Sequence, residues 1–495
     1  MAVGQSKTLT ELGLTAQGGR QARVTGLAVD SREVKQGFLF AAMPGTRVHG
    51  GEFIQYALRM GAGAVLTDAQ GARIAAAELA VSQAALIVAE DPRQTLAYTA
   101  ALWFGAQPET LVAVTGTNGK TSVASFTRQI WQGLGFEAIN LGTTGVEGDW
   151  QASLAHTTPE PITLHRILAG AEAAGITHAA MEASSHGLAQ RRLDGVRLAA
   201  AGFTNLTQDH LDYHASVEDY FAAKAGLFAR VLPEDGVAVI NMDAERGPVM
   251  AAVVQARGQE LIRVGRAAGC DLRLLAQRFE ATGQELRFAW HDREHQVRLG
   301  LIGGFQAENL MVAAGLAIAA GADPDRVVET LPHMKTVHGR MQLVASRANG
   351  AAVFVDFAHT PDAVATGIRA LRPHVMGRLV VIIGAGGDRD PGKRPLMGQA
   401  AAETADLVIV TDDNPRSEDP ATIRAAVMQG CPGAAEVGDR AEAILRGVDA
   451  LGQGDALLIC GKGHETGQIV GDDIFPFDDS EQASVAVSAL DGRGA

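Results

Sequence analysis

The chain has 495 residues, of which 47% are hydrophobic and 20% are charged, and its formal net charge is −14. This length exceeds what one hydrophobic core normally organises, so we expect three domains. The negative charge repels polyanions and argues against a nucleic acid or an anionic membrane as partner. The three cysteines form no metal or redox spacing and no apolar run is long enough to span a bilayer, so we expect a cytoplasmic protein.

The first segment alternates short apolar stretches with turns, as in Val24–Val29 and Gly63–Leu66. It closes at the Gly- and Pro-containing loop 105–109. The pattern predicts a first domain over residues 1–106.

A short apolar strand, a glycine-containing loop and an amphipathic helix follow one another over residues 112–134. Gly116 and Gly119 let backbone N–H groups converge on phosphate oxygens, while Lys120 supplies positive charge and the Thr121 hydroxyl can ligate magnesium. The common eight-residue pattern has glycine where Val114 stands, so this loop is a shortened variant. Strand before and helix after favour a nucleoside triphosphate site over a chance turn.

The segment 107–335 continues with apolar strands separated by helical stretches, which predicts a second α/β domain. A helix is expected over Asn309–Ala320 near its end. The expected strands are Ala179–Met181, Ala199–Phe203 and Val237–Ile240.

Several side chains of this segment are candidates for metal chemistry, each with a plainer alternative. Glu182 follows a strand and either ligates magnesium beside the phosphate loop or is simply solvated. His210 and His214 lack a third zinc ligand, so hydrogen bonding is the plainer interpretation. Lys224 lies in the apolar stripe of a helix that Ser216 caps. Its ammonium either reaches water, which spacing alone favours, or loses its proton and forms a carbamate that ligates metal.

From residue 336 the pattern becomes regular, with continuous apolar strands and long intervening helices such as Pro395–Thr404 and Arg440–Leu451. Such strands predict a parallel, doubly wound sheet in a third domain, residues 336–495. The polar loops 356–359, 386–389, 412–416 and 461–465 should face one crevice, because the carboxyl ends of parallel strands share an edge. The strands are Ala351–Val355, Leu379–Ile383, Leu407–Val410 and Ala456–Ile459.

Two arginines of these loops, Arg389 and Arg416, carry planar forks suited to carboxylates. With Asp413 and Asn414 beside them they indicate a pocket for the zwitterionic end of an amino acid. Arg340 either reaches a γ-phosphate from the domain junction or forms a surface salt bridge.

Together these motifs resemble the Mur ligase family. The resemblance covers nearly the whole chain, with the motifs in the expected order. It implies three α/β domains: an N-terminal UDP-binding domain, a central P-loop ATPase domain and a C-terminal Rossmann-like amino-acid-binding domain. The motifs are Thr115-Gly-Thr-Asn-Gly-Lys-Thr-Ser122, Met181-Glu-Ala-Ser-Ser-His-Gly187, Asn205-Leu-Thr-Gln-Asp-His-Leu-Asp-Tyr-His214, Gly339-Arg-Met341, Asp413-Asn-Pro-Arg416 and Gly461-Lys-Gly-His-Glu465.

The resemblance implies an ATP-dependent amide ligase of peptidoglycan precursor biosynthesis. The motif at Asp413–Arg416 indicates addition of meso-2,6-diaminopimelate to the D-glutamate γ-carboxylate of UDP-N-acetylmuramoyl-L-alanyl-D-glutamate, through an acyl phosphate. The alternatives are a lysine-adding homologue and a catalytically silent nucleotide-binding regulator. The implied cofactors are Mg²⁺, ATP as co-substrate and a carbamylated lysine, and we expect a monomer.

The resemblance also implies residue roles. Gln306 and Gln342 depart from the family pattern, which more often has Asn and Glu there. The implied ATP contacts are Gly116, Thr117, Asn118, Gly119, Lys120, Thr121, Ser122, Asn309, Arg340 and Asp356. The UDP-linked substrate is assigned to Ser31, His49, Thr157, Thr158, Ser184, Gln190 and Arg192, and diaminopimelate to Arg389, Asp413, Asn414, Pro415, Arg416, Gly461 and Glu465. Metal is assigned to Thr121, Glu182, His210 and carbamylated Lys224, and catalysis to Lys120, Lys224, His210 and Arg340.

Overall fold

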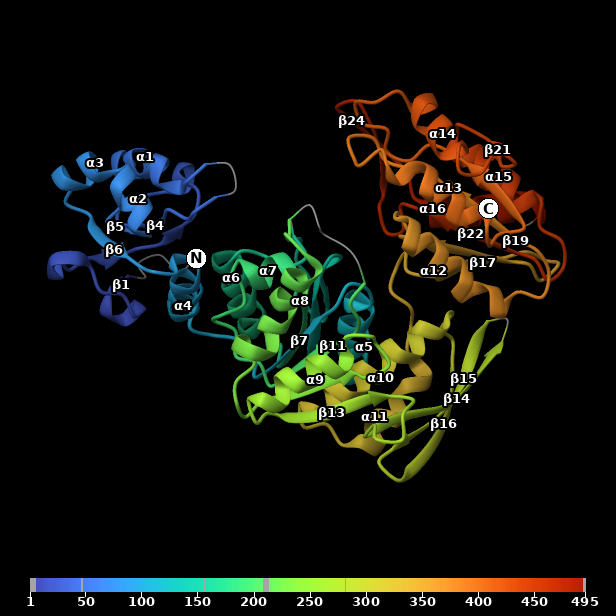
Figure 1. Cartoon of the computed structure of the whole chain (residues 1–495), viewed down its shortest axis with the longest axis horizontal. Coiled ribbons are helices and arrows are strands. Elements are labelled where there is room, and N and C mark those ends of the chain that lie inside the picture. Colours follow the sequence, from blue (N-terminus) through green and yellow to red (C-terminus); the bar gives the residue numbers. More distant parts are fainter. Residues whose placement is uncertain (1–5, 46–47, 155, 208–212, 281, 493–495) are drawn as a thin grey trace. The chain divides into compact units, whose positions relative to one another are not determined.

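The computed structural model describes residues 6–45, 48–154, 156–207, 213–280 and 282–492 (Figure 1). The chain forms two compact units. The first unit comprises residues 1–270 and 312–327, and the second comprises 271–311 and 328–495. The domain boundaries at 106/107 and 335/336 stay predictions.

The first unit begins with a four-stranded parallel sheet in the order β3-β4-β5-β6. The predicted apolar segment Val24–Val29 forms two short strands rather than one. A Cβ on Gly26 would lie 2.4 Å from the Phe38 ring, so the chain passes close to this ring between them. The elements are β1 (Lys7–Thr8), β2 (Arg23–Val24), β3 (Leu27–Ala28), β4 (Leu39–Ala41), β5 (Ala64–Thr67), β6 (Ala85–Val88), α1 (Ile54–Arg59), α2 (Ala69–Ile74), α3 (Ala76–Val81) and α4 (Pro92–Phe104).

A second sheet of the same unit has the order β13-β12-β11-β7-β10-β8-β9 and is parallel except for β9. The predicted strands at 179–181, 199–203 and 237–240 are confirmed. The strands are β7 (Thr110–Thr115), β8 (Ala138–Gly142), β9 (Gly145–Gly148), β10 (His178–Glu182), β11 (Ala200–Phe203), β12 (Val237–Asn241) and β13 (Glu260–Gly265). The helices are α5 (Lys120–Gly133), α6 (Pro161–Ala173), α7 (Ser185–Ala189), α8 (Val217–Gly226), a π-helical turn η5 (Leu227–Val231) and α9 (Gly247–Ala256).

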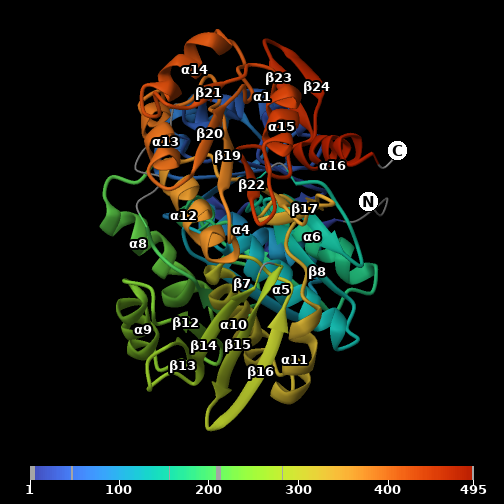
Figure 2. The same cartoon turned by 90° about the vertical axis from the view of Figure 1, so that its right-hand side faces the viewer.

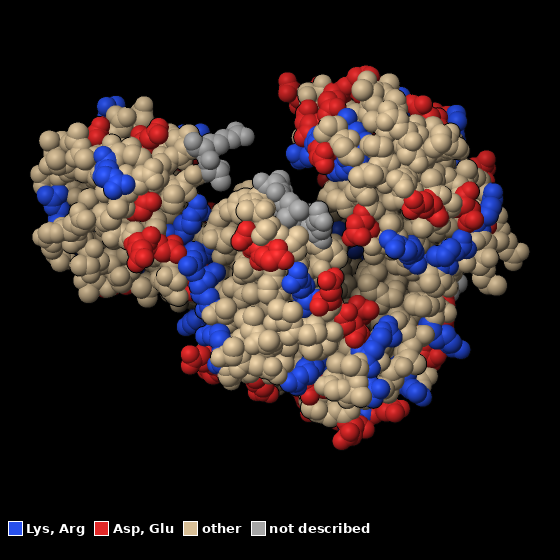
Figure 3. All heavy atoms as spheres, viewed as in Figure 1, with Lys and Arg blue, Asp and Glu red and all other residues tan. Residues whose placement is uncertain are grey.

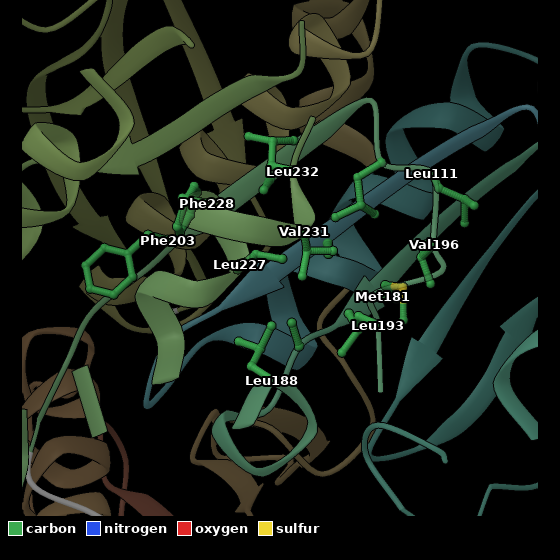
Figure 4. Packing of buried hydrophobic residues seen from close by; sticks show 14 of the residues in the cluster. Leu111, Met181, Leu188, Leu193, Val196, Phe203, Leu227, Phe228, Val231 and Leu232 are labelled. Atoms are coloured by element: carbon green, nitrogen blue, oxygen red, sulfur yellow. The ribbon is translucent and has the colours of Figure 1, made fainter. Parts of the chain in front are cut away.

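The core of this sheet fixes the strand ends that carry the candidate site (Figure 4). Leu111, Met181 and Phe203 from three neighbouring strands belong to one buried cluster with Leu227 and Phe228 from η5, and Phe203 lies next to Phe228. All five are at most 1% exposed. Since each such side chain contributes about 1.5–3 kcal/mol when buried, the ends of β7, β10 and β11 are held firmly.

The second unit contains an antiparallel ribbon, β14-β15-β16, and a six-stranded sheet in the order β17-β18-β22-β19-β20-β21 (Figure 2). Strands β18, β22, β19 and β20 are neighbours and parallel, which confirms that the four predicted loops leave one edge of the sheet. The strands are β14 (Leu272–Glu280), β15 (Gly283–Trp290), β16 (Arg293–Leu299), β17 (Gln342–Ser346), β18 (Ala352–Asp356), β19 (Leu379–Ile383), β20 (Leu407–Val410), β21 (Ala435–Glu436) and β22 (Ala456–Cys460), with a separate hairpin of β23 (Gly467–Val470) and β24 (Asp473–Pro476).

The helices that flank this sheet begin and end close to the predicted positions. The exception is the helix predicted over Asn309–Ala320, which begins earlier, at Gly304, because the chain enters it directly after the left-handed Gly303. This helix is shared between the two units. The helices are α10 (Gly304–Ala319), α11 (Pro324–Thr330), α12 (Pro361–Leu371), α13 (Lys393–Ala402), α14 (Pro420–Met428), α15 (Arg440–Asp449) and α16 (Asp479–Leu490).

The surface carries charges of both signs. On the face in Figure 3, lysines and arginines are interspersed with aspartates and glutamates. Among the described residues, the structure has no helix that is both long and apolar enough to cross a membrane.

Candidate functional site

The phosphate loop links the end of β7 to the start of α5, as the sequence predicts. Gly119 adopts a left-handed φ of 86°, and no described side chain caps the helix that follows it, so the first-turn N–H groups suit an anion. Thr121 and Ser122 are buried in that first turn. Lys120 Nζ donates to the carbonyl oxygens of Gly116 and Thr117, each at 2.8 Å.

The phosphate loop is braced by two residues to which the sequence analysis gave no role, Thr204 and Asn205. Asn205 accepts hydrogen bonds from Thr117 N at 3.0 Å and from Asn118 N at 2.9 Å. Thr204 Oγ1 donates to Asn118 O at 2.6 Å, and a Cβ on Gly116 would lie 1.9 Å from this hydroxyl. The available signal was their place directly after β11, the strand beside β7.

Lys224 is buried below the phosphate loop. Its side chain is 1% exposed, and Nζ donates to Gly116 O at 2.8 Å while lying 4.5 Å from the centre of the Tyr220 ring. The Tyr220 hydroxyl lies 3.2 Å from Thr117 Oγ1. The interpretation in which the ammonium reaches water is therefore wrong, because the helix capped by Ser216 points this lysine inward.

Glu182 ends β10 in register with Val114 of β7. Its carboxylate is 1% exposed and accepts hydrogen bonds from Thr143 N at 2.8 Å and Thr143 Oγ1 at 3.3 Å, so it is not a solvated side chain. Thr143 Oγ1 also lies 3.1 Å from Thr157 Oγ1. His210, the other predicted protein ligand of this metal, lies outside the described residues, and the residues described contain no cluster of three His, Cys, Asp or Glu side chains suited to a metal ion.

Residues assigned to the muramoyl-dipeptide part of the substrate lie next to Glu182. Thr158 Oγ1 donates to Glu182 O at 2.9 Å and accepts from Ser184 N at 3.0 Å. The Arg192 guanidinium donates to Thr158 O and, at 2.8 Å, to Gln190 Oε1. The structure therefore brings this predicted set together.

Ser31 and His49, assigned to the UDP end, lie in the N-terminal sheet region. Ser31 begins a short 3₁₀ helix whose cap is the Asp30 side chain. His49 Nδ1 accepts from Gly51 N at 2.9 Å and Nε2 lies 3.1 Å from Asp68 Oδ1. Both His49 ring nitrogens thus already contact residues of the protein. Of the two residues, Ser31 is therefore the better candidate for a ligand contact.

In the second unit, Arg340 precedes β17 and lies near Asp356, the last residue of the neighbouring strand β18. The Arg340 guanidinium stands 4.6 Å from the centre of the Phe357 ring, and Asp356 Oδ2 accepts from Met341 N at 2.6 Å. Burial raises the pKa of Asp356, and the positive charge of Arg340 opposes this only in part. Gly339 has φ 69°, and a Cβ there would lie 2.2 Å from Gly463 C, so only glycine fits.

The two positions that depart from the family pattern, Gln306 and Gln342, each accept a hydrogen bond near predicted nucleotide contacts. Gln306 Oε1 accepts from Asn309 Nδ2 at 3.2 Å. Gln342 Oε1 accepts from Gly339 N at 2.8 Å. A neutral amide at 342 therefore still fastens the turn that presents Arg340.

The candidate amino-acid pocket is built where β20 and β22 end. Asn414 Nδ2 donates to Glu465 Oε2 at 2.7 Å, and Asp413 lies so close to Gly461 that a Cβ there would come within 2.2 Å of Asp413 Oδ2. Burial raises the pKa of Glu465, and the Asp413 carboxylate raises it further.

Two neighbouring loops carry the arginines assigned to this pocket: Arg389 follows β19 and Arg416 follows β20. Arg416 donates to Gly387 O at 2.9 Å, and Gly387 packs so tightly on Pro415 that a Cβ would lie 1.8 Å from its carbonyl oxygen. Arg389 is exposed on the same loop. Asn414 and Arg416 have φ values of 43° and 52°, a conformation that non-glycine residues keep only when their surroundings hold it.

Sequence reasoning assigned no role to Lys462 or to the ion pair behind the pocket. Lys462 is fully buried, and its Nζ donates to Asn414 Oδ1 at 2.9 Å and Gly467 O at 2.6 Å. Arg440 and Asp479 form a buried two-point ion pair, with both contacts at 2.7 Å. The only sequence signal for Lys462 was its place directly after an apolar strand.

Three Mur ligase domain families match consecutive parts of the chain. The Mur ligase family, catalytic domain, matches residues 23–103, the Mur ligase middle domain matches 114–317, and the Mur ligase, glutamate ligase domain, matches 339–463.

Curated relatives match over nearly the full length. The UDP-N-acetylmuramoyl-L-alanyl-D-glutamate–2,6-diaminopimelate ligase of Bradyrhizobium diazoefficiens is 48% identical over 94% of this chain and 95% of its own. The enzyme of the same name from Caulobacter vibrioides is 47% identical over 94% and 96%. A solved structure of a ligase with this name superposes with a TM-score of 0.74 at 33% identity, covering 98% of this chain and 99% of that one. The MurF ligase from Thermotoga maritima in complex with ADP shares the fold, with a TM-score of 0.60 at 20% identity over 88% and 93%.

Proposed function

The chain belongs to the Mur ligase family, and from that premise we propose that it adds meso-2,6-diaminopimelate to UDP-N-acetylmuramoyl-L-alanyl-D-glutamate at the expense of ATP. The observation that carries this proposal is the 48% identity over 94% of the chain with a ligase of that name. The reaction belongs to the assembly of peptidoglycan precursors.

The chemistry has two steps. The γ-carboxylate of D-glutamate attacks the γ-phosphate of ATP, which releases ADP and leaves an acyl phosphate. The amine of diaminopimelate then attacks the acyl carbon, loses a proton and expels inorganic phosphate, which leaves the amide. Both the carboxylate and the triphosphate are anions, so their approach requires positive charge.

The phosphate loop supplies part of that charge. We propose that Lys120 and the first-turn N–H groups of α5 hold the phosphates, which is supported by the lack of a side-chain cap among the described residues and by the bonds of Thr204 and Asn205 that brace the loop. Arg340 is proposed as a further phosphate contact, Asn309 as the adenine contact and Asp356 as the ribose contact. Their support is the match of their motifs to the family.

Magnesium fits the oxygen donors around the phosphate loop. The Thr121 hydroxyl and the buried Glu182 carboxylate are ligands that Mg²⁺ prefers, and when bound the ion neutralises charge that develops on the phosphates. We propose Lys224 as a carbamate beside them. The support for this proposal is that Lys224 matches the family's carbamylated lysine and lies buried against the phosphate loop, where its Nζ donates to Gly116 O.

The amino-acid pocket supplies specificity. The fork of Arg416 suits the distal carboxylate of diaminopimelate, which lysine lacks, and the carboxylates of Asp413 and Glu465 suit its ammonium groups. Lysine would leave Arg416 without its partner in this pocket, which disfavours the lysine-adding alternative.

A panel of amino acids tests this proposal. Purified protein is given ATP, magnesium and UDP-N-acetylmuramoyl-L-alanyl-D-glutamate, and phosphate release is followed with each amino acid in turn. We expect release with meso-diaminopimelate and at most traces with L-lysine. Preference for lysine would establish the lysine-adding alternative, and no amino-acid-dependent release would establish the silent regulator.

Two further proposals concern the state of the protein. We propose a cytoplasmic location, because ATP is a co-substrate, and a monomer, which light scattering during gel filtration tests.

A further inference from the structure

Lys462 is a buried cation that lies against two residues of the amino-acid pocket, Asp413 and Asn414, and against the start of hairpin β23–β24. It follows β22 and has no exposed surface. Its Nζ donates to Asn414 Oδ1 and to Gly467 O, and lies 3.7 Å from Asp413 Oδ1. One ammonium therefore joins the loop after β22, the loop after β20 and the start of hairpin β23–β24.

These contacts determine which way the Asn414 amide faces. Oδ1 accepts from Lys462 Nζ and also from Ile469 N, each at 2.9 Å. Because an ammonium has no acceptor, only the amide oxygen can face it. Nδ2 must then face Glu465, to which it donates at 2.7 Å.

The backbone of the same loop needs external support. Asn414 and Arg416 both hold left-handed φ values, and non-glycine residues keep such conformations only when the surroundings hold them in place. The hairpin provides that support, since Arg416 N donates to Ile469 O at 3.1 Å and Gly471 N donates to Arg416 O at 2.7 Å. Lys462 fastens the first residue of this hairpin through Gly467 O.

We propose that Lys462 is a positioning residue for the amino-acid substrate, which fixes the Asn414 amide and the Arg416 loop before the substrate arrives. The inference rests on the proposed function and deepens it. Lys462 acts through its neighbours, because its Nζ is enclosed by protein.

The charge of Lys462 also acts on the pocket. Burial lowers the pKa of Lys462, and the Asp413 carboxylate opposes this. The Lys462 ammonium in turn lowers the pKa of Glu465, which burial and Asp413 raise. The other charged groups that act on these two residues are Arg416, Arg440 and Asp479.

The test compares Lys462→Met, which removes the charge at similar length, with Lys462→Gln, which removes the charge but keeps a donor. Arg378→Met is the matched control, because Arg378 pairs with Asp455 at 2.8 Å at the opposite end of strands β19 and β22. Thermal melting and ADP affinity establish that each variant is folded.

For both Lys462 variants we expect the KM for meso-diaminopimelate to rise roughly ten- to a hundred-fold, the effect of a misplaced positioning group, with the KM for ATP changed less than about two-fold. The acid limb of kcat/KM for diaminopimelate should move to higher pH, because Glu465 loses a stabilising cation. Arg378→Met should change neither quantity.

An unchanged KM for diaminopimelate together with an unmoved acid limb would overturn the proposal. A parallel rise of the KM for ATP and for diaminopimelate would also overturn it, because it indicates general loosening of the fold. If Lys462→Met does not fold, Lys462→Gln decides the same question. Failure of the proposed function is distinguishable, because the unaltered protein would then not respond to diaminopimelate at all.

Discussion

The phosphate loop and the amino-acid pocket both provide for charged ligands, but they are built differently. The loop is one continuous segment, residues 116–122, that presents backbone N–H groups at a helix N-terminus. The pocket is assembled from loops after β19, β20 and β22 and from hairpin β23–β24, and buried charged side chains hold it.

The two sites therefore depend on different kinds of contact with residues that are distant in sequence. The loop keeps its shape through backbone-directed bonds from Thr204 and Asn205, and one buried lysine, Lys224, lies below it. In the pocket, the Asp413 carboxylate raises the pKa of Glu465 and opposes the lowering of the pKa of Lys462 by burial. A single change should therefore act locally in the loop but spread through the pocket.

The largest effect is expected for Lys224→Ala. Loss of its hydrogen bond to Gly116 O and of the proposed carbamate should lower kcat roughly 10²–10³-fold, comparable to removal of one preorganised transition-state contact. Short carboxylic acids such as acetate should restore part of the activity by supplying the missing carboxylate. The exposed Lys335→Ala serves as control, and full activity of Lys224→Ala without acetate would exclude the carbamate role.

Arg416→Ala tests whether recognition of the amino acid can be lost while nucleotide binding at the phosphate loop is kept. We expect kcat/KM for diaminopimelate to fall about 10²-fold, because a buried two-point charge pair with the distal carboxylate is lost. ADP affinity, measured by calorimetry, should stay as in the unaltered protein. Arg416→Lys should recover little, since lysine lacks the planar fork. Unchanged turnover of Arg416→Ala would refute the assignment of the pocket.

A smaller effect is expected on the pH dependence of stability. A buried histidine of the first unit and one of the second differ in their hydrogen bonds. No described residue forms a hydrogen bond with either His165 ring nitrogen in the first unit, whereas His374 Nε2 in the second accepts from Gly303 N at 3.0 Å. Burial lowers the pKa of His165 to about 4. Between the unfolded pKa near 6.5 and this value the unfolded chain binds the extra proton, so stability falls as pH falls.

The expected slope is about 1.4 kcal/mol of unfolding free energy per pH unit in that window. His165→Phe should remove this part of the acid sensitivity, measured as the urea midpoint at several pH values. The exposed His333→Phe should leave it in place. An unaltered pH dependence in His165→Phe would show that the ring finds another partner.

The sequence alone determined the phosphate loop and the central parallel strands of both large sheets. Glycines, a lysine and a threonine at fixed spacing between an apolar strand and an amphipathic helix are local signals, and β19 and β20 have the predicted bounds because buried strands read as continuous apolar runs. The common edge of the four polar loops followed from the same parallel arrangement.

Only the tertiary structure decided what the buried polar residues do. Spacing placed Lys224 in an apolar stripe but could not show whether its ammonium reaches water, because that depends on Gly116, 108 residues away. The place of Lys462 after an apolar strand could not show what its ammonium contacts, since its partners Asn414 and Gly467 lie in other segments. Periodicity reports which face of an element is buried, whereas a hydrogen bond or an ion pair depends on side chains that distant parts of the chain bring within about 3 Å.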